Sequence, residues 1–344
     1  MRAGVIGATG YGGAELLRIL HTHPHLKATS VYSSSQQGSF ITGHYPHLQG
    51  IVPLRLEEID PGKVAKETDI VFLAVPTGIA SELAPQLLKE GCTVIDLSGD
   101  FRLKNSDEYE NWYKKKPAPS DWVEKAIYSI PEFHREQVKE ANFISNPGCY
   151  PTATLLGLAP LAQSGLLVED SIIIDAKSGV SGAGQTASLG TIYSELNENF
   201  KIYKVNQHQH IPEIEQVLQS WGLHSPITFS THLVPMTRGI MATIYGSVKK
   251  EMTEADVYEL YKNHYENEPF IRVREKGVFP ATKEVSGSNY CDIGITLDER
   301  TGRVTIVSVI DNLMKGAAGQ AIQNANILLG FEETAGLTMS PLYP

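Results

Sequence analysis

The 344-residue sequence predicts two domains, a doubly wound α/β domain with a parallel sheet and an α+β domain that follows it. Apolar runs of strand length alternate with amphipathic helical segments through residues 2–97, which is typical of a parallel sheet covered on both faces. A glycine-rich turn joins the first strand to the first helix. After residue 149 this alternation stops, which indicates an α+β domain with an antiparallel sheet. A chain of this length is also too long for one comfortable hydrophobic core.

Each element of the first half is predicted by its pattern of apolar residues. Leu16, Leu17 and Leu20 face inward from the first helix, and the strand-length runs are largely apolar. The expected strands are residues 2–7, 27–33, 68–75 and 92–97, and the expected helices are residues 12–22 and 79–90. Residues 99–131 mix aromatic, charged and proline residues without a period, so we expect a long excursion there, close to the active face.

The second half is expected to open with a helix from Cys149 to about Gln163. The expected strands are residues 171–178, 227–235, 240–250 and 303–310, and the expected helices are residues 212–221, 253–265 and 314–329. Small residues in the last helix allow close packing, and we expect this helix to return to the first domain. The predicted domains are therefore residues 1–148 with 314–344, and residues 149–313.

Composition narrows the class of protein. A formal net charge of −10 argues against a nucleic-acid partner, because nucleic-acid binders usually carry a basic face. The three cysteines, Cys92, Cys149 and Cys291, cannot all pair and show no short metal-type spacing, which fits a reducing compartment. No stretch approaches the length of a membrane span, and no leader-like segment opens the sequence. We expect a cytoplasmic protein without a membrane or nucleic-acid partner.

The glycine-rich turn from Gly7 to Gly13 predicts a dinucleotide site, because it follows a strand and opens a helix whose N-terminus can hold a pyrophosphate. The second strand ends in Ser33-Ser34-Ser35 without the acidic residue that would bind the ribose of NAD, so NADP is favoured. A merely structural turn is the alternative. The cofactor-binding residues expected are Gly7, Thr9, Gly10, Tyr11, Gly12, Gly13, Ser33, Ser35 and Pro76.

Cys149 is the expected nucleophile. It lies between a short apolar strand and a helix start marked by Pro151, where helix-terminal amides favour the thiolate. His208 and His210 could be a metal pair, but no convincing third ligand accompanies them, so no metal is expected. One of the two is the better candidate for an acid/base, and His210 is preferred because it precedes the helix start at Pro212.

Two loops have the composition of an anion-binding site. Residues 177–185 combine a lysine with small and hydroxyl residues, and residues 97–102 place an arginine after a strand. A flexible turn and a surface ion pair are the respective alternatives. The substrate-binding residues expected are Arg102, Asn146, Lys177, Ser178, Ser181 and Gly182.

Together these segments resemble the N-acetyl-γ-glutamyl-phosphate reductases, NADPH-dependent oxidoreductases of arginine biosynthesis, over nearly the whole chain. The segments that carry the resemblance are 7–17, 97–103, 145–152, 177–184, 208–214 and 311–320. The resemblance implies a Rossmann domain with a glyceraldehyde-3-phosphate-dehydrogenase-like catalytic domain, Cys149 as nucleophile, Asn312 near the nicotinamide, and a homotetramer or homodimer. Gln185 departs from the family, which more often has arginine there, and so does the serine-rich end of the second strand.

The resemblance implies reductive dephosphorylation of N-acetyl-γ-glutamyl phosphate to the semialdehyde through a thioester on Cys149, with His210 supplying a proton. The nearest alternative is a sister acyl-phosphate reductase that acts on an aminoadipate derivative in lysine biosynthesis, since one methylene gives only about 1–3 kcal/mol of discrimination. A remote alternative from another class is a non-catalytic NADP-binding redox sensor with Cys149 as its switch.

Overall fold

The computed structural model describes residues 1–249 and 252–343. The chain divides into two compact units. Unit 1 comprises Met1–Gly148 and Ala317–Met339, and unit 2 comprises Cys149–Gly316 and the tail from Ser340. The expected division at residue 314 thus differs by three residues from the observed one. The tail was expected in the first domain, but it belongs to unit 2, where the Leu342 amide donates to the Ser286 carbonyl at 2.8 Å.

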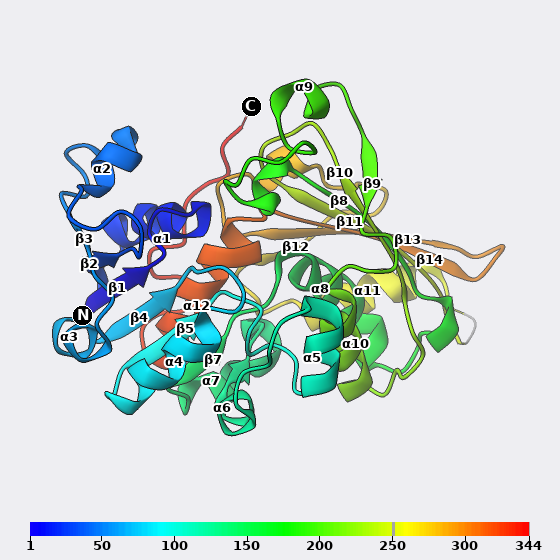
Figure 1. The fold of residues 1–344 in the computed structure, drawn as a ribbon. Helices are drawn as coiled ribbons and strands as arrows, with labels where there is room; N and C mark the ends of the chain where they lie inside the picture. The colour runs from blue at the N-terminus through cyan, green and yellow to red at the C-terminus, as the bar shows by residue number, and fades with distance from the viewer. Residues whose placement is uncertain (250–251, 344) are drawn as a thin grey trace. The chain divides into compact units, whose positions relative to one another are not determined.

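Unit 1 contains a seven-stranded sheet in the order β3-β2-β1-β4-β5-β7-β6, in which every pair is parallel (Figure 1). Its strands are β1 (Arg2–Ile6), β2 (Lys27–Tyr32), β3 (Leu56–Glu57), β4 (Ile70–Leu73), β5 (Thr93–Asp96), β6 (Ile127–Tyr128) and β7 (Phe143–Ser145). The order reverses between β1 and β4, which makes this the point where ligands bind in doubly wound sheets. The predicted doubly wound α/β fold is confirmed.

Helices cover both faces of this sheet, and all four residues of β4 are consequently buried. Two helices on one side, α3 and α4, contact each other, while α12 contacts both α1 and α7. The bounds of these helices are α1 (Tyr11–Thr22), α3 (Pro61–Glu67), α4 (Ala80–Lys89), α7 (Pro131–Lys139) and α12 (Gly319–Leu328), and the short α2 spans Ile41–His44.

The expected irregular excursion over residues 99–131 is wrong in part, because it contains the helices α5 (Ser106–Tyr113) and α6 (Ser120–Lys125) as well as β6. The Asn105 side chain caps α5 by accepting from the amides of Asp107 and Glu108. Tyr109 is the one residue of α5 that is buried, so this helix carries no apolar period that a sequence pattern could reveal.

Unit 2 contains a second seven-stranded sheet in the order β12-β13-β14-β11-β8-β10-β9. Its strands are β8 (Ile173–Ser178), β9 (Lys201–Tyr203), β10 (Thr228–Leu233), β11 (Ile240–Ser247), β12 (Ile271–Val273), β13 (Cys291–Asp298) and β14 (Arg303–Ile310). The expectation of an antiparallel sheet is correct only in part, because β10 pairs parallel with β8 and β12 pairs parallel with β13. A long connection that includes α9 (Tyr193–Leu196), β9 and α10 (Ile211–Ser220) lets β8 and β10 run in the same direction.

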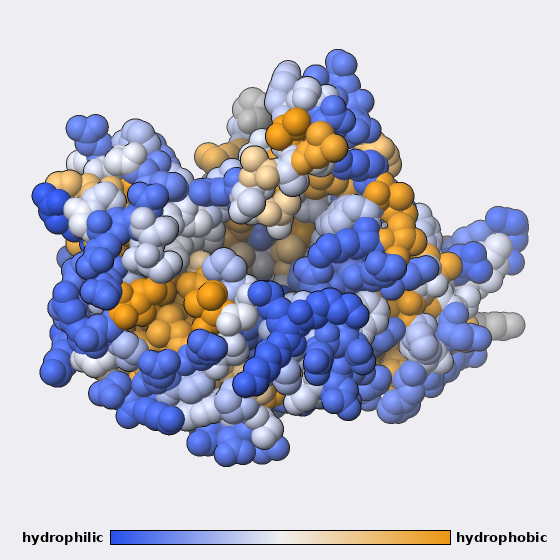
Figure 2. Space-filling model, viewed as in Figure 1, coloured by the Kyte–Doolittle hydropathy of each residue, from blue (hydrophilic) through white to orange (hydrophobic). Residues whose placement is uncertain are grey.

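One face of this sheet is covered by α8 (Cys149–Gln163), with α10 and α11 (Glu254–His264) packed against α8. Every α8 residue from Tyr150 to Ala162 is buried. Gly157 lets α8 approach the sheet closely, because a Cβ there would lie 2.9 Å from Cδ1 of Ile244. Apolar side chains are exposed elsewhere in unit 2, around α9 (Figure 2), and they include Leu189, Ile192, Phe200, Ile202 and Val205.

No helix in the described part of the chain is long and apolar enough to cross a membrane.

A buried carboxyl group lies at the end of β5. Asp96 is fully buried, and its two oxygens accept from the Ser98 amide and the Ser98 hydroxyl, both at 2.9 Å. Burial raises the pKa of Asp96 to about 7, with the nearby carboxylate of Asp100 adding to the effect. The folded chain therefore holds a proton on Asp96 more tightly than the unfolded chain does.

This raised pKa predicts a defined pH dependence of stability. The stabilisation from protonated Asp96 is complete below about pH 4 and is lost as the pH rises to about 7. Because Asp96→Asn cannot titrate, the unfolding free energy of the parent chain should fall relative to this variant by up to about 1.4 kcal/mol per pH unit in that window. Urea unfolding of both proteins at several pH values measures the difference. Parallel pH profiles would contradict the assignment.

Candidate active site

The glycine-rich turn of unit 1 connects β1 to α1 at the point where the strand order reverses. Gly7 has φ +82°, and a Cβ there would lie 2.3 Å from the Ala74 carbonyl oxygen in the loop after β4. A Cβ at Gly13 would lie 2.5 Å from the Gly7 oxygen. The first and last glycines are thus required by the packing of the turn itself.

The middle of the turn has space that the protein does not fill. At Gly10, which precedes the first residue of α1, a Cβ would meet no atom closer than the Gly7 oxygen at 3.5 Å. No side chain caps the start of α1, so its first amides and the positive end of the helix dipole face this space. These features fit the pyrophosphate of a dinucleotide.

The other residues of unit 1 that are expected around the cofactor lie in loops at the same edge of the sheet. Ser33 follows β2 and is buried, and its hydroxyl accepts from the Ser35 amide at 3.3 Å, which shapes the turn in which Ser35 is exposed. The Thr9 carbonyl accepts from the Tyr45 hydroxyl at 2.8 Å. Pro76 belongs to the loop after β4, and its carbonyl accepts from the Ile79 amide.

Arg102 and Asn146 of unit 1 are both buried and are joined by a hydrogen bond. Nε of Arg102 donates to the Asn146 carbonyl at 2.9 Å, and Nη2 donates to the Leu97 carbonyl at the same distance. The Asn146 side chain donates to the Ala317 carbonyl at 3.1 Å and accepts from Nδ2 of Asn324 at 3.2 Å. These contacts fix the carboxyl ends of β5 and β7, and the substrate role of both residues stays a prediction.

Cys149 is the first residue of α8, as the sequence predicted, and it is half-buried. A Cβ on Gly316 would lie 2.7 Å from the Cys149 Cβ, so glycine is needed where this turn passes the cysteine. The positive end of the α8 dipole favours the thiolate form at this position. Cys92 and Cys291 are buried, in accord with structural roles.

An aromatic cluster links the residue after the cysteine to both histidines. The Tyr150 ring packs edge-on against His208 at a centroid distance of 5.3 Å and against His210 at 5.9 Å. The Tyr150 and Tyr203 hydroxyl oxygens are 3.0 Å apart. Burial is the main reason why the pKa of Tyr150 is raised and why that of Tyr203 is raised to about 12. The charge of Cys149 contributes to both shifts. The structure therefore brings Cys149, His208 and His210 into one neighbourhood of unit 2.

The surroundings of His208 hold its ring in the neutral form. Nδ1 of His208 accepts from the His210 amide at 3.2 Å, and a proton on that nitrogen would break the bond. Burial lowers the pKa of His208 to about 3, with the Lys204 charge as the lesser cause. His208 is accordingly a neutral ring that orients its neighbour. His210 is buried at the residue that precedes α10, and its ring centroid lies 4.7 Å from that of His208.

The loop after β8 is tied to Asn312. Nδ2 of Asn312 donates to the Ser181 hydroxyl at 2.9 Å, and Oδ1 accepts from the Gly239 amide at 2.7 Å. Gly182 lies beside the Ser178 hydroxyl, which a Cβ on Gly182 would approach to 3.1 Å. Lys177 forms an ion pair with Asp175 of the same strand at 2.7 Å. The loop residues are thus brought together, while the lysine charge is partly neutralised by its neighbour.

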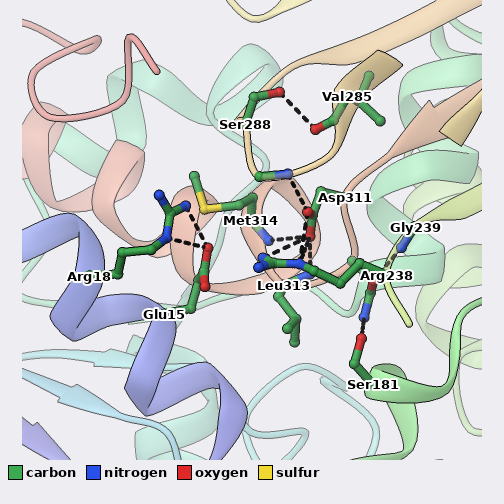
Figure 3. Close-up of polar contacts among 12 residues, drawn as sticks. Glu15, Arg18, Ser181, Arg238, Gly239, Val285, Ser288, Asp311, Leu313 and Met314 are labelled. Atoms are coloured by element: carbon green, nitrogen blue, oxygen red, sulfur yellow. Dashed lines mark hydrogen bonds and ion pairs between the residues drawn. The ribbon is translucent and has the colours of Figure 1, made fainter. Parts of the chain in front are cut away.

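Sequence reasoning missed the ion pair that organises these loops (Figure 3). Asp311 is fully buried and lies 3.0 Å from Nε of Arg238. Its carboxylate also accepts from the amides of Gly287, Leu313 and Met314. The segment 311–320 is among those that carry the family resemblance, but only Asn312 was singled out within it. Nothing in the local pattern pairs Asp311 with an arginine 73 residues away.

Tyr150 and Tyr203 were also missed as site residues, although Tyr150 adjoins Cys149 in the sequence. Among the residues that the structure describes, no group of three or more His, Cys, Asp or Glu side chains could hold a metal ion.

Comparison with known proteins agrees with the division into one unit with the glycine-rich turn and another with Cys149. Residues 2–141 match the family model described as "Semialdehyde dehydrogenase, NAD binding domain". Residues 149–312 match the model described as "Semialdehyde dehydrogenase, dimerisation domain". The fold and the two matches thus define the class of protein: the chain has the NAD-binding and dimerisation domains of the semialdehyde dehydrogenases.

Similar proteins of known name indicate the particular family within this class. The chain is 59% identical to an N-acetyl-gamma-glutamyl-phosphate reductase of Geobacillus sp. (strain WCH70) and 58% identical to that of Bacillus subtilis (strain 168), each over the full length of both proteins. The chain belongs to the N-acetyl-γ-glutamyl-phosphate reductase family.

Solved structures share the fold at low identity. Aspartate semialdehyde dehydrogenase II of Vibrio cholerae has a TM-score of 0.72 at 18% identity, with 96% of this chain and 98% of that one covered. The Candida albicans aspartate semialdehyde dehydrogenase has a TM-score of 0.70 at 18% identity, with 95% and 98% covered.

The space at Gly10 predicts a variant that folds but does not bind. The Cβ of Gly10→Ala makes only ordinary contacts in the protein, yet it enters the space that fits the pyrophosphate. Thermal stability should stay unchanged, while the Kd for NADPH should rise at least about tenfold, because a clash replaces charge-assisted hydrogen bonds. Titration of NADPH fluorescence measures the Kd.

Two other glycines give the matched controls. Gly13→Ala should lower the melting temperature, because its Cβ meets backbone atoms. Gly43→Ala, which has no atom within 4 Å of the new Cβ, should change neither quantity. Unaltered NADPH affinity in Gly10→Ala would place the pyrophosphate elsewhere.

Proposed function

We propose that this chain is an NADPH-dependent reductase that converts N-acetyl-γ-glutamyl phosphate to N-acetylglutamate 5-semialdehyde, inorganic phosphate and NADP⁺ in arginine biosynthesis. The observation that carries the proposal is Cys149 at the first residue of α8, with both histidines packed on the adjoining Tyr150. Identities of 57–59% to reductases of this name, over the whole chain, support this substrate over the aminoadipate derivative.

Cys149 begins the reaction as a thiolate stabilised by the helix N-terminus. Its sulfur attacks the acyl carbon, the bond to the phosphoryl oxygen breaks, phosphate leaves, and a thioester forms on the cysteine. Bound NADPH supplies the hydride that reduces the thioester carbon. Collapse of the resulting thiohemiacetal returns its hydroxyl proton to His210, breaks the carbon–sulfur bond, releases the aldehyde and restores the Cys149 thiolate.

His210 carries the proton in this scheme, and His208 does not. The oxygen that becomes negative after hydride addition needs a proton donor, and a neutral histidine with an acceptor nitrogen fixed by a backbone amide cannot become charged to provide one. The pKa of about 3 keeps His208 neutral at any working pH. His208 holds the His210 backbone and packs against its ring, so it acts as a positioning residue.

The remaining predicted residues divide between cofactor and substrate. The turn Gly7–Gly13 with Thr9 and Tyr11 holds the pyrophosphate, and Ser33 and Ser35 donate to a 2′-phosphate, which favours NADP over NAD. Pro76 and Asn312 complete the cofactor set. Phosphate and carboxylate groups of the substrate bind among Arg102, Asn146, Lys177, Ser178, Ser181 and Gly182.

We also propose that the chain forms a homodimer or homotetramer through unit 2. The match to a family model described as a dimerisation domain covers residues 149–312 of this unit. Several large apolar side chains around α9 are exposed, among them Leu189 at 77% and Phe200 at 58%. Burial of such side chains against another copy would stabilise an oligomer.

The proposed reaction is best tested in reverse, because the aldehyde is stable and the acyl phosphate is not. Purified protein should reduce NADP⁺ with N-acetylglutamate 5-semialdehyde in a phosphate-dependent manner, followed by absorbance of NADPH. Cys149→Ser should bind NADPH as the parent chain does and lose turnover, because it cannot form the thioester. Preference for the aminoadipate aldehyde would move the enzyme to lysine biosynthesis. Substantial turnover by Cys149→Ser would contradict the mechanism.

The histidine assignment predicts two different pH profiles. His210→Asn should lower kcat by about 10² to 10⁴-fold and remove one limb of the pH–rate profile, because general acid catalysis is lost. His208→Asn should lower kcat through misplacement of His210 and leave the apparent pKa values of the profile in place. If His208→Asn lost this limb of the pH–rate profile and His210→Asn kept it, His208 would be the proton donor and His210 the positioning residue.

A further inference from the structure

We propose that Asp100 is a positioning residue for the dinucleotide: its buried carboxylate holds the loop Pro76–Ile79, which forms one wall of the cofactor site of unit 1. The inference rests on the proposed function only in taking NADPH as the cofactor. Asp100 lies outside the glycine-rich turn and four residues after the end of β5. Asp100 is not among the residues that the sequence predicts to bind the cofactor or the substrate.

The contacts of Asp100 converge on the start of α4. Its side chain is almost fully buried, and both carboxylate oxygens accept from the Gly78 amide, at 2.7 and 2.8 Å. Oδ2 also accepts from the Ser81 amide at 3.0 Å. Ile79, which precedes the first residue of α4, cannot cap the helix with its side chain. Asp100 therefore supplies from another segment the acceptor that a capping side chain usually provides.

The loop that Asp100 holds belongs to the crevice where dinucleotides bind. It follows β4, and β4 lies next to β1 at the reversal of strand order. The carbonyl of Ala74, two residues before this loop, packs against Gly7 so closely that no side chain fits at Gly7. Figure 2 shows apolar side chains over the region labelled β4 and α4 in Figure 1, and Ile79 in this loop is half exposed. A displaced loop would therefore alter both the glycine-rich turn and an apolar surface beside it.

Asp100 is itself held in place. Its amide donates to the Ser98 hydroxyl at 3.1 Å, and the Tyr109 hydroxyl donates to its Oδ1 at 2.7 Å. The Tyr109 ring stacks on Tyr113 at 4.8 Å, and Tyr113 packs so closely over Gly99 that a Cβ there would lie 2.4 Å from the ring. Burial, together with the bond to Asp100, raises the pKa of Tyr109, so this hydroxyl stays a donor at working pH.

Substitution of Asp100 by asparagine should weaken cofactor binding in a specific way. An asparagine has the same shape, but its amide group presents N–H donors to backbone amides that need acceptors, so the loop loses bonds to a charged acceptor. The site would then have to order the loop on binding, which weakens cofactor affinity. The side-chain hydrogen bonds of Asp100 go to Gly78, Ser81 and Tyr109 and to none of the residues proposed to bind the substrate, so the KM for the aldehyde should not change.

The test compares Asp100→Asn and Tyr109→Phe with Asp107→Asn, a matched charge removal at an exposed position in the first turn of α5. NADPH Kd by fluorescence titration, the melting temperature, and KM for NADP⁺ and for the aldehyde are measured on each full-length protein. In Asp100→Asn, Kd and KM for the nucleotide should rise at least about tenfold with the aldehyde KM unchanged. Tyr109→Phe should raise Kd about two- to fivefold, and Asp107→Asn should change nothing.

A lowered melting temperature in Asp100→Asn with an NADPH Kd within about twofold of the parent would overturn the proposal, because capping alone would then explain the residue. If Asp100→Asn fails to fold, Tyr109→Phe decides, and an unchanged Kd in that variant overturns the proposal. A parent chain that binds NADPH without acyl-phosphate turnover would remove the proposed reaction and leave this binding test valid. A parent chain without NADPH binding would overturn both.

Discussion

Buried carboxylates that accept hydrogen bonds from loop amides are the interaction on which both units depend. Amides in the loops beyond the strand ends have no ladder partner, and a buried amide without an acceptor costs about 1–3 kcal/mol. Asp311 accepts from three amides and pairs with Arg238 in unit 2, while Asp100 accepts from Gly78 and Ser81 in unit 1. Each carboxylate therefore fixes loops that belong to different stretches of sequence.

This arrangement explains how flexible loop sequences become rigid site walls. Asn312 follows Asp311 directly, and its side chain joins the Ser181 hydroxyl to the Gly239 amide. Preorganised donors and acceptors of this kind need no rearrangement when a ligand binds, which is how enzymes gain transition-state stabilisation. The aromatic cluster around Tyr150 serves the same purpose for the histidines, since tight packing keeps His208 neutral and His210 beside it.

The helix that starts at Cys149 and the glycine-rich turn could be predicted from sequence because both depend on neighbouring residues. Apolar periodicity also revealed α1, β4 and β14. It could not reveal α5, in which only Tyr109 is buried, or β13, where Gly294 lies against the Val278 carbonyl and the strand pattern is interrupted. The antiparallel expectation for unit 2 failed at β8 and β10, because the direction of pairing depends on the path of a long connection and not on the strands themselves.

The sequence by itself determined the two-unit α/β plan, the glycine-rich turn and the family, and it predicted Cys149 as the nucleophile. These follow from local steric and capping rules and from motifs that lie within about ten residues of chain. Only the tertiary structure decided that His208 stays neutral, because its pKa depends on burial by Tyr150, Tyr203 and Phe229. It also decided that Asp311 meets Arg238 and that Asp100 meets Gly78, since burial and long-range pairing depend on segments that the chain brings together only when it folds.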